Sequence, residues 1–162
     1  MGRIFIYYRL ALTEEYLIFR YKHSGANATD EMGTPDSVEF INVAKDDALA
    51  WPASVHRTYP STVNARMGST IKPFVQKSLA VNDTLLAVLN DRLGLPKGAI
   101  ARRHAPGAPS GSETRCIRTP PRPDIPVDKA TLGAHTDFGS MVCSLSVIIW
   151  HGRLISKLVV PP

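Results

Sequence analysis

The residues of this chain whose types and spacing could do chemistry lie in the segment TLGAHTDFGS, residues 131–140. His135 and Asp137 are separated by one residue, and on an extended segment residues i and i+2 point to the same side. Imidazole and carboxylate are ligands suited to iron(II), and two histidines with one carboxylate form a facial triad that leaves positions open for a cosubstrate and dioxygen. The pair therefore predicts two of the three protein ligands of a ferrous site.

The pattern His-x-Asp is short, and a second interpretation of it stays open. A histidine at the end of a strand can form a hydrogen bond with a nearby carboxylate without binding any metal. Gly133 and Gly139 flank the pair and would let a ligand or a neighbouring backbone come close, which suits a metal site without requiring one. The choice depends on the elements that position the pair.

The clearest of these elements is a helix over residues 61–93. Its apolar residues recur at spacings of three and four, which is the period of one helix face. Ser61 or Thr62 can cap its N-terminus, and Gly94 ends it. Pro73 lacks a backbone donor, so a kink or a break is expected there. We expect the apolar face to be core, and the alternative is an interaction face.

Apolar and β-branched stretches predict strands before and after this helix. Residues 4–22 fit either two short strands or one poor helix. The other strands are expected at residues 38–43, 114–118, 141–150 and 154–160. Turn-forming residues predict loops over residues 24–37, 105–113 and 119–128.

The longer string LGAHTDFGS closely resembles the metal-binding segment of non-haem iron(II), 2-oxoglutarate-dependent oxygenases of the isopenicillin-N-synthase-like, fungal type. Three other stretches are similar to that family and follow its order. Residues 24–51 resemble its N-terminal region, LLAVLNDRLGLP (85–96) resembles the end of its long helix, and RCIRTPPRP (115–123) resembles a strand that ends in a Pro-Pro turn. The resemblance covers residues 20–140 and depends on order and spacing more than on any single motif.

The resemblance implies an iron(II)- and 2-oxoglutarate-dependent dioxygenase, an oxidoreductase that acts on a small organic substrate of the secondary-metabolite kind. The metal ligands that it implies here are His135 and Asp137. It also implies an α+β fold, in which N-terminal strands and the long helix (residues 1–97) are followed by the first strands of an incomplete jelly-roll, or double-stranded β-helix, core (residues 98–162).

The chain departs from the family pattern in its second half. Arg118 and Thr119 stand where the family has Asn-x-Tyr. The family places a second histidine ligand and a 2-oxoglutarate-binding arginine several dozen residues after the motif, whereas only 25 residues follow Asp137. His151 and Arg153 have the right chemical types but come too early, and their sequence no longer resembles the family.

The missing half of the site predicts reduced or absent turnover. The chain is expected to be a truncated form of the family, and its residues 141–162 are either a native tail or a product of truncation or mis-splicing. His23, His56 and His104 could complete a site only from upstream and are expected to be surface or loop histidines. The alternative function is a non-catalytic remnant, or a partner-binding fragment, of the oxygenase family.

Composition excludes several other classes of protein. The formal net charge is +5, but the 19 Lys and Arg residues are scattered along the chain without interleaved aromatic residues, so nucleic-acid binding is not expected. No apolar run approaches the roughly 18 residues of a membrane span. Two cysteines and no signal-like N-terminus favour a reducing, cytoplasmic location. The expected partner is a small-molecule substrate, and the oligomeric state is left open.

Overall fold

The computed structural model describes residues 2–9, 21–119, 139–150 and 153–159. The chain divides into two compact units, which are unit 1 (Met1–Val43 and Ser112–Pro162) and unit 2 (Ala44–Gly111). None of the described helices is long and apolar enough to cross a membrane. The division of the sequence at residue 97, which concerned family regions, stays a prediction.

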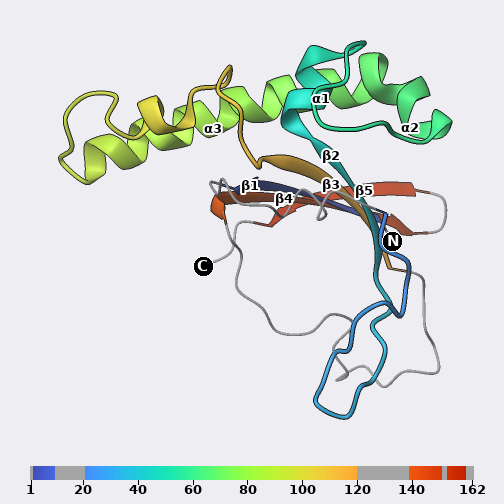
Figure 1. Ribbon diagram of the computed structural model, residues 1–162. Coiled ribbons are helices and arrows are strands. Elements are labelled where there is room, and N and C mark those ends of the chain that lie inside the picture. The colour runs from blue at the N-terminus through green and yellow to red at the C-terminus, as the bar shows by residue number, and fades with distance from the viewer. Residues whose placement is uncertain (1, 10–20, 120–138, 151–152, 160–162) are drawn as a thin grey trace. The chain divides into compact units, whose positions relative to one another are not determined.

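Unit 1 is built on one five-stranded sheet with the strand order β2-β3-β1-β4-β5 (Figure 1). The strands are β1 (Gly2–Arg9), β2 (Glu39–Ala44), β3 (Glu113–Arg118), β4 (Gly139–Trp150) and β5 (Arg153–Val159). In the middle of the sheet, β1 pairs antiparallel with β3 and with β4, and β5 pairs antiparallel with β4. The four strands predicted after residue 22 are confirmed. For residues 4–22 the described part, up to Arg9, is strand and not helix.

The predicted loop over residues 24–37 is confirmed, and buried polar contacts hold its two ends together. Lys22 forms an ion pair with the buried Asp36 and donates to the carbonyl of Val38 at 2.7 Å. The other carboxylate oxygen of Asp36 accepts the backbone N–H of Gly25 at 2.9 Å. An aspartate can be buried here because each of its oxygens meets a donor.

Unit 2 is helical and follows the sequence expectation closely. Its elements are α1 (Lys45–Ala50), α2 (Ser61–Arg66), a π-helical turn η1 (Met67–Ile71), α3 (Lys72–Arg92) and a 3₁₀ turn η2 (Ala101–His104). α2, η1 and α3 follow one another without a gap and form the helix predicted from residue 61. The π-helical turn η1 ends at Ile71, two residues before Pro73. Such turns commonly occur where the regular hydrogen-bond pattern of an α-helix is interrupted.

The predicted cap of this helix is wrong in detail. The N-cap residue is Pro60, and no side chain caps the helix. The carbonyl of Pro60 accepts the N–H groups of both Val63 and Asn64 at 3.0 Å, while the Asn64 amide donates to the carbonyl of Tyr59 at 2.9 Å. With Pro60 at the N-cap, Ser61 and Thr62 are the first two helical residues, so neither hydroxyl stands at the capping position.

The predicted stop at Gly94 is confirmed. Gly94 has φ of +63°, its N–H donates to the Asp91 carbonyl at 3.1 Å, and the N–H of Leu95 donates to the Asn90 carbonyl at 3.1 Å. These two bonds form a Schellman motif, which needs a left-handed residue that glycine adopts at little cost. The Asn90 amide adds bonds to the Leu95 carbonyl at 3.1 Å and the Ile100 N–H at 3.2 Å.

The expectation that the apolar face of the helix is core is only partly right. Met67, Val75, Leu79 and Leu86 are buried, but a second set of apolar residues on α3 and its exit is exposed. The exposed set is Val81, Leu85, Val88, Leu89, Leu93 and Leu95. Spacings of three and four also occur between residues on neighbouring faces, so periodicity alone overestimated the buried stripe.

At the level that the structure supports, the chain is a mixed α and β protein with one sheet and one long helix. This agrees with the predicted α+β class. A jelly roll requires two facing sheets. The described strands form a single sheet, so the incomplete jelly roll stays a prediction.

The Schellman motif gives a test of how α3 ends. Replacing Gly94 with Ala should lower the free energy of unfolding by about 1 kcal/mol, because a Cβ atom disfavours the left-handed conformation. Gly107→Ala is the matched control, since Gly107 has open space around the added Cβ and no positive φ. Urea denaturation measures both, and an equal loss in the two variants would contradict the assignment.

Candidate functional site

The predicted iron ligands His135 and Asp137 lie outside the described residues. In the sequence they fall between β3 and β4. β3 ends at Arg118 opposite Gly2 of β1, and β4 begins with Gly139 opposite Arg9, so the two strands run parallel to each other on either side of β1. The two predicted ligands precede Gly139 by four and two residues in the sequence.

His151 also lies outside the described residues. In the sequence it follows Trp150, the last residue of β4, so the 12 residues of that strand stand between it and the pair along the chain. The expectation that His151 does not complete the site stays a prediction.

The other histidines do not form a metal centre within the part of the chain that the structure describes. His23 is exposed in unit 1, with Nδ1 at 2.8 Å from the Ser24 carbonyl. His56 and His104 belong to unit 2, and His56 Nε2 lies 3.0 Å from the Asp46 carboxylate. No group of three or more His, Cys, Asp or Glu side chains among the described residues is placed to hold a metal ion.

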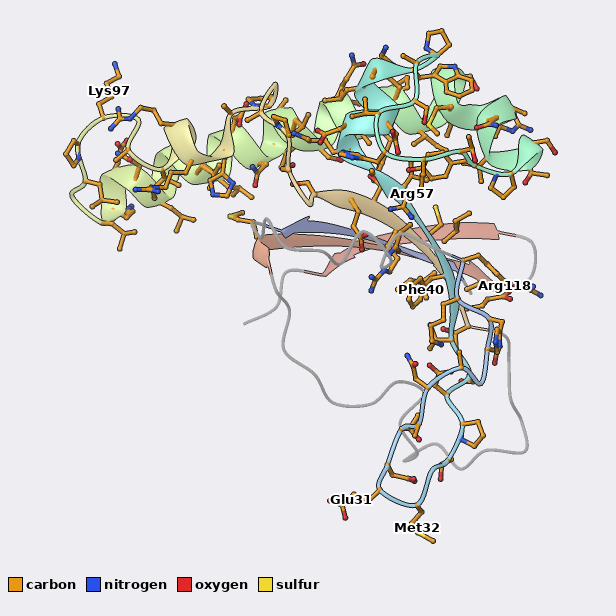
Figure 2. All side chains as sticks on the ribbon, viewed as in Figure 1. Glu31, Met32, Phe40, Arg57, Lys97 and Arg118 are labelled. Carbon is orange, nitrogen blue, oxygen red and sulfur yellow. The ribbon has the colours of Figure 1, made fainter. Side chains whose placement is uncertain are left out.

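The residues that replace the family's Asn-x-Tyr lie at the end of β3. Arg118 is 72 % exposed and donates from Nη1 to Glu39 Oε1 at 2.8 Å (Figure 2). Glu39 also accepts the hydroxyl of Tyr21 at 2.9 Å. The hydrogen bond from Tyr21, together with Arg118, holds the pKa of Glu39 below its usual range, and the same bond raises the pKa of Tyr21. Arg118 is therefore a surface link between β3 and β2.

Arg115, also on β3, is at the centre of a half-buried polar cluster. Its Nε donates to Asn42 Oδ1 at 2.7 Å and its Nη2 to Glu113 Oε1 at 2.8 Å. The guanidinium carbon lies 4.2 Å from the centre of the Phe40 ring, within the range of a cation–π contact. Through its contacts with Asn42 and Phe40, Arg115 joins β3 to β2. Because Glu113 neutralises its charge, Arg115 is poorly suited to bind a carboxylate ligand.

A second cluster, in unit 2, is organised by the buried carboxylate of Asp47. One oxygen accepts the backbone N–H groups of Val55 and His56 at 2.7 and 2.8 Å, and the other accepts the Tyr59 hydroxyl at 2.7 Å. The same hydroxyl accepts the N–H of Ala44 at 3.0 Å. Burial, together with the bond to Asp47, raises the pKa of Tyr59, so this hydroxyl remains a donor at physiological pH.

Asp46 holds a different part of unit 2. Its Oδ2 meets His56 Nε2 and the backbone N–H of Ser110, each at 3.0 Å, and its Oδ1 lies 3.0 Å from Lys45 Nζ. Lys45 in turn donates to the carbonyls of Pro106 and Ala108 at 2.9 and 2.7 Å. Burial alone would raise the pKa of Asp46, but the bonds from His56, Ser110 and Lys45 outweigh it and lower that pKa.

Sequence reasoning missed this network, which we call the Asp46–Asp47 network. The segment Lys45-Asp46-Asp47 is the first turn of α1. Two acidic residues in a first helical turn, followed within a dozen residues by a histidine and a tyrosine, were the available signal. The network joins the irregular segments 51–60 and 105–111 to α1, and its groups are used in structural bonds.

The described clusters are therefore structural, and the candidate chemistry remains with the His135–Asp137 pair. The chain matches no protein-family model, no curated protein and no solved structure.

The lowered pKa of Asp46 predicts a specific acid sensitivity. A carboxylate whose pKa is lower in the folded state than in the unfolded chain stabilises the fold above its unfolded pKa, about 3.9, and this contribution is lost as the pH falls through the folded value. The stability advantage of the wild type over Asp46→Asn should therefore shrink as the pH falls below about 4. Urea denaturation between pH 7 and pH 3 would measure it.

Proposed function

We propose that this chain is an iron(II)- and 2-oxoglutarate-dependent oxidoreductase of the non-haem oxygenase family, with a small organic substrate, and that His135 and Asp137 are two of its metal ligands. The observation that carries the proposal is the segment LGAHTDFGS, in which an imidazole and a carboxylate stand two residues apart, two residues before a long strand. On an extended segment this spacing directs both side chains to one metal ion.

The order of elements around the segment supports the same family. The long helix ends at Gly94 before Leu95-Pro96, and β3 carries the sequence ETRCIR directly before Thr119 and the Pro-Pro pair. β4 then begins two residues after Asp137. This is the order that the resemblance implies. In the proposal, β3 and β4 are the first strands of an incomplete jelly-roll core.

The chain fits the implied metal only in part. His135 and Asp137 have the donor atoms that ferrous iron takes in a facial triad. His151 comes only 14 residues after Asp137, earlier than the family's second histidine, and is not proposed as the third donor. When bound, iron and 2-oxoglutarate would activate dioxygen for oxidation of the substrate. What this chain's own residues contribute is the binding of the metal through one nitrogen and one carboxylate.

Metal binding can be tested without turnover. Anaerobic titration of the full chain with iron(II) and 2-oxoglutarate should produce the weak visible charge-transfer band of the metal–cosubstrate chelate. His135→Ala and Asp137→Ala should each abolish the band, because a single remaining protein ligand cannot hold the metal.

His151→Ala is the matched control and should leave the band unchanged, since His151 is not proposed as a ligand. Absence of the band in the wild type at excess cosubstrate would remove the oxygenase proposal. Loss of the band in His151→Ala would identify His151 as a third ligand.

The lack of a second histidine at the family's spacing favours a second candidate function, a non-catalytic remnant or partner-binding fragment of the same family. A site with two protein ligands binds metal more weakly than a triad and holds it with less defined geometry. The described residues of unit 1 offer no further histidine except the exposed His23. A chain of this kind would keep the helix and the strands while losing the reaction.

The two candidates differ in oxygen uptake. An active oxygenase should consume dioxygen in the presence of iron(II) and 2-oxoglutarate, and His135→Ala should reduce the rate to that of the solution without protein. A remnant should give the solution rate in both forms. Uptake by the wild type that His135→Ala abolishes would refute the remnant, and equal rates would refute the enzyme.

A further inference from the structure

We propose that the exposed face of α3 binds an acidic, amphipathic helix of a protein partner. The face consists of Val81, Leu85, Val88 and Leu89, which we call the α3 stripe. The proposal deepens the second candidate function by naming the chemistry of the partner. It does not require metal, because the stripe lies in unit 2 and the His135–Asp137 pair in unit 1.

The α3 stripe is distinct from the buried face of the same helix. At about 100° per residue, its four members fall within an arc of about 100°. The buried residues of α3 fall within a separate, adjacent arc, and they are Val75, Leu79, Asn82, Leu86 and Asn90. The helix is thus held through one face while a second apolar face remains open.

The exposure of the α3 stripe is large for aliphatic side chains. Val81 is 55 % exposed, Leu85 39 %, Val88 52 % and Leu89 43 %. Single exposed apolar residues are normal, whereas a contiguous set marks an interaction surface. Leu93 and Leu95 extend the set beyond the end of α3.

The charges around the α3 stripe favour an acidic partner. Arg92 lies in line with the stripe, and Lys77 lies about 70° from its centre. The acidic residues Asp83 and Asp91 lie about 170° and 110° away. From residue 61 to residue 104 the sequence has seven Lys and Arg residues and two Asp residues, and Lys97 projects from the loop that follows α3 (Figure 2).

Spacing selects a helix as the occupant. Positions 81, 85, 88 and 92 alternate steps of four and three, which is how one helix presents side chains to another. A second copy is disfavoured, because a parallel pair would set Arg92 against Arg92, and an antiparallel pair centred near Leu85 would bring Arg92 of one copy to Lys77 of the other. A lipid surface is disfavoured, because the stripe lacks the Trp and Phe residues typical of interfacial helices.

The proposal can be tested on the full chain with a synthetic helical peptide. The probe has leucine at steps of four and three, glutamate on its flanks and a fluorescent label, and anisotropy reports binding. The double variant Leu85→Glu, Val88→Glu should weaken binding at least about tenfold, as loss of central apolar contacts does. Val55→Glu is the matched control, since Val55 is also 55 % exposed and lies off α3, and it should bind like the wild type.

Charge reversal at Arg92 distinguishes specific binding of the peptide from non-specific hydrophobic binding. Arg92→Glu should weaken binding of the glutamate peptide and strengthen binding of the same peptide with lysine in place of glutamate. His135→Ala should bind the glutamate peptide like the wild type, so failure of the metal proposal would leave this result unchanged. Far-UV circular dichroism of each variant would show that α3 is intact.

Three outcomes would overturn the proposal. The first is equal affinity of the wild type and the double variant for the glutamate peptide. The second is a wild type that does not bind the peptide but forms a concentration-dependent dimer, which Leu85→Glu abolishes. The α3 stripe would then bind a second copy of the chain. The third is a wild type that does not bind the peptide but sediments with phosphatidylserine vesicles, while the double variant does not. The α3 stripe would then bind a lipid surface.

Discussion

The antiparallel pairing of β1 with both β3 and β4 is the constraint on which unit 1 depends. β1 joins the N-terminus to strands that come more than 100 residues later, so the sheet cannot form before the chain closes that distance. The same pairing makes β3 and β4 run parallel to each other, with the segment that bears His135 and Asp137 between them in the chain. It also keeps β4 extended over 12 residues.

In unit 2, buried carboxylates have the corresponding role. Asp47 and Asp46 receive backbone and side-chain donors from two irregular segments, residues 51–60 and 105–111. A buried carboxylate is costly unless its oxygens are bonded, so these segments and the carboxylates stabilise one another. The π turn before Pro73 and the Schellman motif at Gly94 then set where the long helix is irregular and where it ends.

These constraints separate the two kinds of function that the chain could have. In the proposed metal chemistry, His135 and Asp137 would supply two ligands from the segment just before β4. Partner binding would depend on α3, whose buried face packs in unit 2. A partner could therefore bind the exposed face of α3 without any loss of the contacts that hold the helix. Aliphatic side chains provide the contact area on that face, and the nearby cations Arg92 and Lys77 provide the preference for an acidic partner.

By itself, the sequence determined the local features: the strands at 38–43 and 114–118, the helix from Ser61, its stop at Gly94 and the choice of His135 and Asp137 as candidate ligands. These follow from properties of neighbouring residues, namely hydrophobic period, backbone conformation and ligand chemistry. Only the tertiary structure decided the features that depend on residues far apart in the chain. Those were the place of β1 between β3 and β4, the donors that surround Asp46 and Asp47, and which leucines of α3 are buried. Apolar residues at spacings of three and four indicate that their side chains share one face of a helix. Whether that face is buried depends on what packs against it.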